Sequence, residues 1–139
     1  MKKSPEVGIG ICIVRANKVL LGKRKNSHGD GSWSFPGGHL EMNETWEECA
    51  EREVLEETNL VIRNPRFAGV TNDIFISDHQ HYITIFMLAE YENGTVKVNE
   101  PDRCDEWKWF DWDNLPEPLF LPVRNLLKTG FAPSDLEKE

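Results

Sequence analysis

The chain has 139 residues, of which 39% are apolar, and its formal net charge is −8 at pH 7. A length near the commonest domain size predicts one domain over residues 1–139 with its own hydrophobic core. The negative charge disfavours binding to nucleic acid backbones, and no apolar run is long enough to span a membrane. Three cysteines without Cys-x-x-Cys spacing favour reduced thiols in the cytoplasm over a disulfide framework or a zinc site.

Alternating apolar residues and turn signals predict several strands in the chain. In chain order, strands are expected at residues 7–14, 18–25, 33–35, 67–76, 81–91 and 106–110. The glycine-rich stretch at 26–32 predicts a loop. Because side chains alternate along a strand, Trp107 and Trp109 should share a face of the last strand.

Two helices are expected between and after these strands. Thr45 followed by Glu48 is a capping-box pattern that predicts a helix from about residue 45 to 58. Asn59 directly follows this helix, and asparagine tolerates the left-handed backbone conformation in which helices commonly end. A second helix is expected at 121–128, with a polar, loose tail at 131–139. Strands on both sides of a central helix, followed by a terminal helix, indicate an α/β/α sandwich.

The most informative motif is an acidic stretch that enters the first helix from a glycine loop. Its members are Gly38, Glu44, Arg52, Glu53, Glu56 and Glu57. Residues three and four apart are neighbours on a helix, so the last three carboxylates converge and repel one another. A divalent cation on that face would relieve the repulsion, and hard oxygen ligands suit Mg²⁺ or Mn²⁺. The alternative is an ordinary solvated acidic face.

This spacing resembles the Nudix box, and the chain is identified as a member of the Nudix hydrolase family. The likeness extends to the segments Leu21–Lys25, Phe35–Glu41, Glu44–Ala50 and His81–Met87. These segments are similar to the MutT-like nucleoside triphosphate diphosphatases. The resemblance implies a mixed sheet between helices with a loop–helix–loop box. It also implies a homodimer that cleaves (deoxy)nucleoside triphosphates to monophosphate and diphosphate, with a role in nucleotide-pool sanitation.

The resemblance assigns roles to the box residues. Metal ligands are expected to be the backbone carbonyl of Gly37 and the carboxylates of Glu53, Glu56, Glu57 and, from a later loop, Glu100. Arg52 should orient a carboxylate, with Glu44 as its partner. Glu53 is the first choice for the general base. The alternatives are an ordinary surface ion pair for Arg52 and a solvated loop position for Glu100.

The substrate side of the site is less sharply defined by the sequence. Arg24 could clamp phosphate oxygens bidentately, although a solvated cluster on a strand edge is the alternative. Gly38 and His39 could touch phosphate or base. The candidate pocket residues, for which core packing is the competing role, are Trp33, Phe35, Thr84, Leu121 and Val123. Gln80 and the 119–123 segment depart from the related branch, so a different or looser base pocket is expected.

Two further functions share the same motif. The first is a diphosphatase that acts on ADP-ribose or a nucleotide sugar, with the same box and another pocket. The second is a nucleotide-binding sensor without catalysis. The intact acidic face disfavours a sensor, because a protein that only binds has no need of crowded carboxylates.

Overall fold

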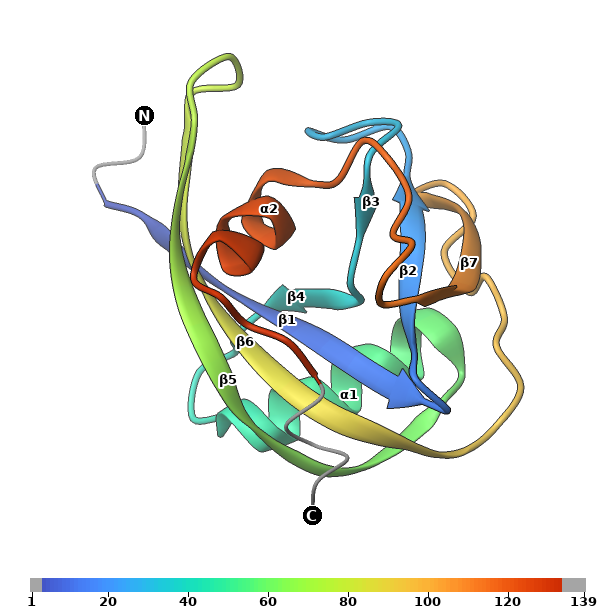
Figure 1. Cartoon of the computed structure of the whole chain (residues 1–139). Helices are drawn as coiled ribbons and strands as arrows, with labels where there is room; N and C mark the ends of the chain where they lie inside the picture. Colours follow the sequence, from blue (N-terminus) through green and yellow to red (C-terminus); the bar gives the residue numbers. More distant parts are fainter. Residues whose placement is uncertain (1–3, 134–139) are drawn as a thin grey trace.

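The computed structural model describes residues 4–133, which form one mixed sheet with helices packed against it (Figure 1). The helices are α1 (Trp46–Thr58) and α2 (Leu121–Lys128). The strands are β1 (Glu6–Arg15), β2 (Lys18–Arg24), β3 (Trp33–Ser34), β4 (Gly37–His39), β5 (Val61–Phe75), β6 (Gln80–Asn93) and β7 (Cys104–Asp111). Each predicted helix and strand is therefore present, although several bounds differ.

Strand β1 lies at the centre of the sheet and makes it mixed. It pairs antiparallel with β2 on one side and parallel with β6 on the other, in the order β3-β2-β1-β6-β5. The short strand β4 also pairs with β1, while β7 pairs with β2. Because β1 is buried on both faces, its near-continuous run of apolar residues is the pattern expected of a central strand.

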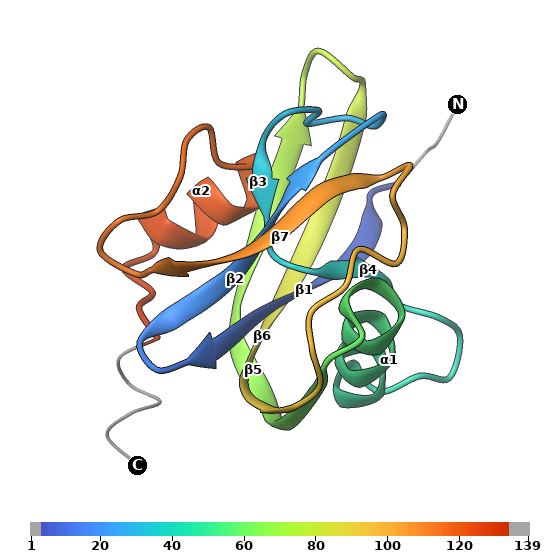
Figure 2. The ribbon, with the colours of Figure 1, turned by 90° about the vertical axis from the view of Figure 1, so that its right-hand side faces the viewer.

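The two helices cover opposite faces of the sheet, as Figure 2 shows. Ile11 and Ile13 of β1 pack in the same apolar cluster as Val54 of α1. Cys12 lies between them in the sequence and belongs to the second cluster, together with Val123 of α2. Alternation along one strand thus supplies both cores, and the predicted α/β/α sandwich is confirmed.

The start and the end of α1 follow the sequence signals. The Thr45 hydroxyl accepts a hydrogen bond from the backbone N–H of Glu48, and the Glu48 side chain accepts one from the N–H of Thr45. Asn59 ends the helix with a left-handed φ of 68°. The capping box fixes where the first turn begins, so it also fixes which later residues share a face.

Two elements of the sheet differ from the expectation. Strand β5 begins at Val61, well before residue 67, because its pairing with β6 continues through register shifts on both sides of Arg66. Pro65 lies within the first irregular stretch, where a residue without an N–H is tolerated. Gly37–His39 forms β4 against β1, where the sequence predicted a glycine loop.

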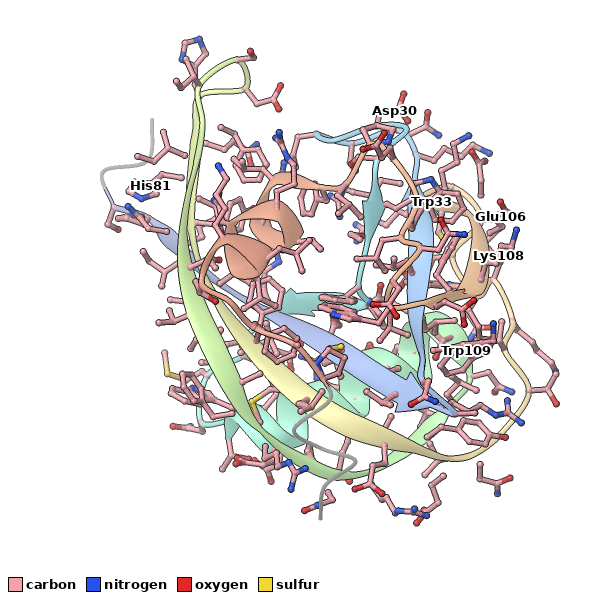
Figure 3. The ribbon with its side chains drawn as sticks, viewed as in Figure 1. Asp30, Trp33, His81, Glu106, Lys108 and Trp109 are labelled. Carbon is pink, nitrogen blue, oxygen red and sulfur yellow. The ribbon has the colours of Figure 1, made fainter. Side chains whose placement is uncertain are left out.

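Two further predictions concern the face that the β7 tryptophans share and the loose tail at the end of the chain. Trp107 and Trp109 pack against the same core cluster, while Glu106 and Lys108 are exposed on the outer side of β7 (Figure 3). Phe131 is not loose, because its ring lies 5.8 Å from that of Trp112. The remainder of the predicted tail, residues 134–139, lies outside the described residues. Within residues 4–133, neither helix is long and apolar enough to cross a membrane.

Candidate active site

Part of the acidic motif lines a cavity of about 730 Å³ that residues of α1, the glycine loop and the sheet enclose. Glu53 and Glu57, one helical turn apart, both line it. Glu100 lines it from the loop between β6 and β7. We call these three residues the acidic wall.

Arg52 holds the carboxylates around this wall in place. Its Nε and Nη2 atoms donate to the two carboxylate oxygens of Glu44, at 2.6 and 3.0 Å. Its Nη1 donates to Glu53 at 3.0 Å and to Glu56 at 3.1 Å. These hydrogen bonds fit the orienting role that the resemblance implied, with Glu44 as the bidentate partner.

The acidic wall is electrostatically strained. Burial raises the pKa of Glu57 well above the usual carboxyl range, and the nearby charges of Glu53 and Glu100 raise it further. Burial also raises the pKa of Glu53, against the opposing effect of Arg52. Outside the wall, the hydrogen bonds from Arg52 lower the pKa of Glu44 to about 2. The wall therefore crowds negative charge where solvent does little to relieve it.

Two glycines let the backbone approach the wall closely. The N–H of Gly37 donates to a carboxylate oxygen of Glu57 at 3.2 Å. A side chain at Gly37 would overlap the carbonyl oxygen of Ile9, and one at Gly38 would overlap the Glu53 carboxylate. Gly37 can therefore pack on β1, and Gly38 against α1, only because both positions lack a Cβ.

The donors of this region suit a hard divalent cation. Carboxylate and carbonyl oxygens are the ligands that such ions take, and a cation would offset the repulsion that raises the Glu57 pKa. Within residues 4–133, no group of three or more acidic, histidine or cysteine side chains is arranged to hold a metal ion without rearrangement. Glu56 does not line the cavity and is hydrogen-bonded to Arg52. Of the expected metal ligands, Gly37, Glu53, Glu57 and Glu100 line the cavity.

Another part of the cavity is aromatic. His28, Phe75, Tyr82 and Phe120 line it and contact one another; we call them the aromatic cluster. Arg24 lies beside this cluster, with its guanidinium 3.9 Å from the centre of the Phe120 ring. Its Nε donates to the carbonyl oxygen of His28 at 2.9 Å. Burial lowers the pKa of Arg24, and the nearby charge of Glu57 opposes that shift. Arg24 and Glu57 line the same cavity.

Most of the predicted substrate-side residues line this cavity. They are Arg24, Phe35, Gly38, His39, Thr84 and Val123. Trp33 does not line it: strand alternation turns Ser34 of β3 toward the cavity, while Trp33 packs edge-on against Phe110 at 5.0 Å (Figure 3). Leu121 borders a separate surface hollow near the β5–β6 turn.

Sequence reasoning missed the aromatic cluster. Its members come from the loop after β2, the β5–β6 hairpin and the residue before α2, and no local pattern joins them. Gln80, which departs from the related branch, does line the cavity. His81 lies at the far edge of the molecule, where its ring nitrogen contacts the side chain of Asn72 (Figure 3).

Comparisons with known proteins agree with this architecture. A family model described as the NUDIX domain matches residues 4–129. The chain therefore has the fold and the acidic site of a hydrolase of diphosphate bonds, and it belongs to the Nudix family as a MutT-like member. Proteins of this family generally use divalent metal ions.

Three relatives illustrate the likeness. An ADP-ribose pyrophosphatase from Methanocaldococcus jannaschii is 35% identical over 84% of this chain and 68% of its own length. An oxidized purine nucleoside triphosphate hydrolase from Danio rerio is 34% identical over 76% of this chain and 66% of its own. The crystal structure of a MutT NUDIX hydrolase from Burkholderia pseudomallei superposes with a TM-score of 0.85, at 34% identity over 91% of this chain and 98% of that one. The chain spans less than half of some longer relatives.

Proposed function

We propose that this protein hydrolyses (deoxy)nucleoside triphosphates to nucleoside monophosphate and diphosphate with Mg²⁺, or with Mn²⁺ as the alternative ion. One observation carries the proposal: a crowded acidic wall, a half-buried guanidinium and an aromatic cluster share a single cavity of about 730 Å³. That volume falls in the range of small-molecule sites. Its parts match the metal-bound polyphosphate, the phosphate charge and the flat base of a nucleotide.

Different residues would bind the cation and the phosphates of the substrate. When bound, the cation neutralises phosphate oxygens and acidifies water. Glu53, Glu57, Glu100 and the Gly37 carbonyl would hold it, and Glu56 could join them only by leaving Arg52. Arg24 lies where its guanidinium could bind phosphate oxygens.

Glu53 is the proposed general base. Burial raises its pKa, against the opposing charge of Arg52, which makes the carboxylate a better proton acceptor. Arg52 holds one of its oxygens by a hydrogen bond of 3.0 Å. As the proton of water passes to Glu53, the water oxygen bonds to phosphorus and the anhydride P–O bond breaks, so the leaving phosphate group departs with the bonding electron pair.

A second substrate class is supported by the relative from Methanocaldococcus jannaschii, whose name is ADP-ribose pyrophosphatase. The acidic wall would serve equally for ADP-ribose or a nucleotide sugar, because the bond to be cleaved is again a phosphoanhydride. The two classes differ in the number of phosphates and in what is attached beyond them. The Danio rerio relative, named for a nucleoside triphosphate, supports the first class.

An initial-rate screen with Mg²⁺ that identifies both products separates these functions. Release of diphosphate and a nucleoside monophosphate from a triphosphate supports the main proposal. Conversion of ADP-ribose to AMP and ribose 5-phosphate, at a higher kcat/KM than any triphosphate, would replace it with the alternative. Cleavage of neither class would contradict both.

Four broader expectations stay predictions: a single domain, a cytoplasmic location, a role in nucleotide-pool sanitation and a homodimer. The edge strand β5 supports association, because Val70 and Ile74 are more than half exposed on it. Light scattering coupled to size-exclusion chromatography tests the dimer. A mass near 16 kDa, that of one chain, at micromolar concentration would contradict it.

A further inference from the structure

The aromatic cluster lines part of the cavity with four rings that pack against one another. The imidazole of His28 lies edge-on to Phe75 at 4.6 Å, nearly parallel to Tyr82 at 5.7 Å and tilted against Phe120 at 5.4 Å. Phe75 also contacts Phe120 at 5.5 Å. Flat ligands bind well on such a surface, because stacked and edge-on ring contacts are both favourable.

His28 is the polar member of this cluster whose ring is not fixed by hydrogen bonds. Its Nδ1 is shielded from solvent and has no hydrogen-bond partner within residues 4–133. A shielded polar atom without a partner is costly, and the contacts that hold the ring are those with other rings. The imidazole can therefore turn a nitrogen toward a ligand without breaking an existing bond.

The protonation state of His28 suits recognition of a neutral base. Burial lowers the pKa of the imidazole, and the nearby charge of Arg24 lowers it further. At neutral pH, one ring nitrogen then donates and the other accepts. A nucleobase edge carries both donors and acceptors, so a neutral imidazole can complement it.

Arg24 links this cluster to the acidic wall. It stacks on Phe120 and is bonded to the backbone of His28, while Glu57 lies close enough to affect its pKa. A nucleotide whose phosphates lie between Arg24 and the wall would have its base beside the cluster.

We propose that His28 hydrogen-bonds the edge of a purine that lies on the aromatic cluster, and so sets the base preference of the enzyme. This inference rests on the proposed function, because it assumes a nucleotide substrate. Purines are favoured because a bicyclic base covers more of the ring surface than a pyrimidine. His28 is thus assigned as a specificity-determining residue, separate from the box.

The test measures binding of product-like ligands by calorimetry, in the absence of metal. The ligands are guanosine monophosphate, cytidine monophosphate and ribose 5-phosphate. His28→Phe keeps the ring and removes both nitrogens. We expect it to weaken guanosine monophosphate binding about tenfold, the usual effect of one lost hydrogen bond to a ligand, and to leave ribose 5-phosphate unchanged. His28→Asn, which restores a polar group near Nδ1, should recover part of the loss.

His81→Phe is the matched control, because the same exchange occurs on β6 outside this cavity. It should bind all three ligands like the parent protein. Unchanged binding of guanosine monophosphate to His28→Phe overturns the inference, as does an equal loss for ribose 5-phosphate. The product screen tests hydrolysis separately. A protein that cleaves triphosphates normally but shows no base effect at His28 would refute this inference alone.

Discussion

The acidic wall and the aromatic cluster lie in the same cavity but are held by different forces. The wall and its surroundings are fixed by directed hydrogen bonds: Arg52 donates to Glu44 and Glu53, and the backbone of Gly37 donates to Glu57. The cluster is held chiefly by ring contacts, which tolerate small shifts. Charge on a reacting phosphate needs fixed partners, whereas a flat base needs mainly a surface.

This difference predicts that substitutions in the acidic wall and substitutions near the aromatic cluster will change different kinetic constants. Changes at the wall should lower kcat, because they remove groups that act on the transition state. Changes near the cluster should raise KM, because they remove contacts made equally before and during the reaction.

The largest effect is expected for Glu57→Gln. Loss of one wall charge should lower kcat by about 10²–10³-fold and abolish the dependence on metal concentration. Initial rates against Mg²⁺ concentration measure both. Glu51→Gln is the control, since Glu51 is an exposed carboxylate on the same helix. Equal activity of the two variants would rule out the wall as the metal site.

A smaller loss is expected for Arg52→Lys, which keeps the charge but not the planar fork that binds Glu44 bidentately. We expect kcat to fall about 10- to 100-fold, as for other groups that orient ligands, with KM little changed. Arg63→Lys is the control, because Arg63 makes an exposed pair with Glu90. A pure rise in KM would contradict the orienting role.

Arg24→Lys should raise KM about tenfold and leave kcat within a factor of two, because stacking on Phe120 and the guanidinium fork are both lost. Arg15→Lys provides a matched control: Arg15 also stacks on a ring, that of Tyr91 at 3.9 Å, but it does not line the cavity. Steady-state measurements of kcat and KM for both variants test this prediction. A fall in kcat at constant KM would place Arg24 among the groups of the wall.

The smallest effect concerns stability without metal. Because the pKa of Glu57 is raised in the folded state, folding favours its protonated form. Stability of the metal-free protein should therefore fall as pH rises from the ordinary carboxyl range through the raised pKa.

At pH 7, Glu57→Gln should be more stable than the parent by about 1 kcal/mol, the usual size of a stabilising substitution, and should lose less stability as pH rises. Urea unfolding at pH 5 and pH 8 in the presence of a chelator measures this. A variant that is less stable than the parent at pH 8 would show that the wall is not strained.

The sequence predicted the wall better than the cluster for a physical reason. Glu53 and Glu57 lie on one helix, so their spacing alone places them together, and the Thr45 cap sets the phase of the helix. The members of the cluster meet only through tertiary packing. The placement of Trp33 shows the same limit: two strand residues can face either way, and the pairing with β2 decided in favour of Ser34.

The close packing of Gly37 and Gly38 limits how this enzyme can change. A methyl group at either position would overlap backbone or a wall carboxylate, so neither position offers a gradual route to a new activity. In the loop after β2, a side chain at Gly29 would also overlap the Phe120 ring, but the neighbouring His28 already contributes a side chain to the cavity. Directed evolution toward another nucleotide should therefore accumulate substitutions around His28, while Gly37, Gly38 and the acidic wall stay unchanged.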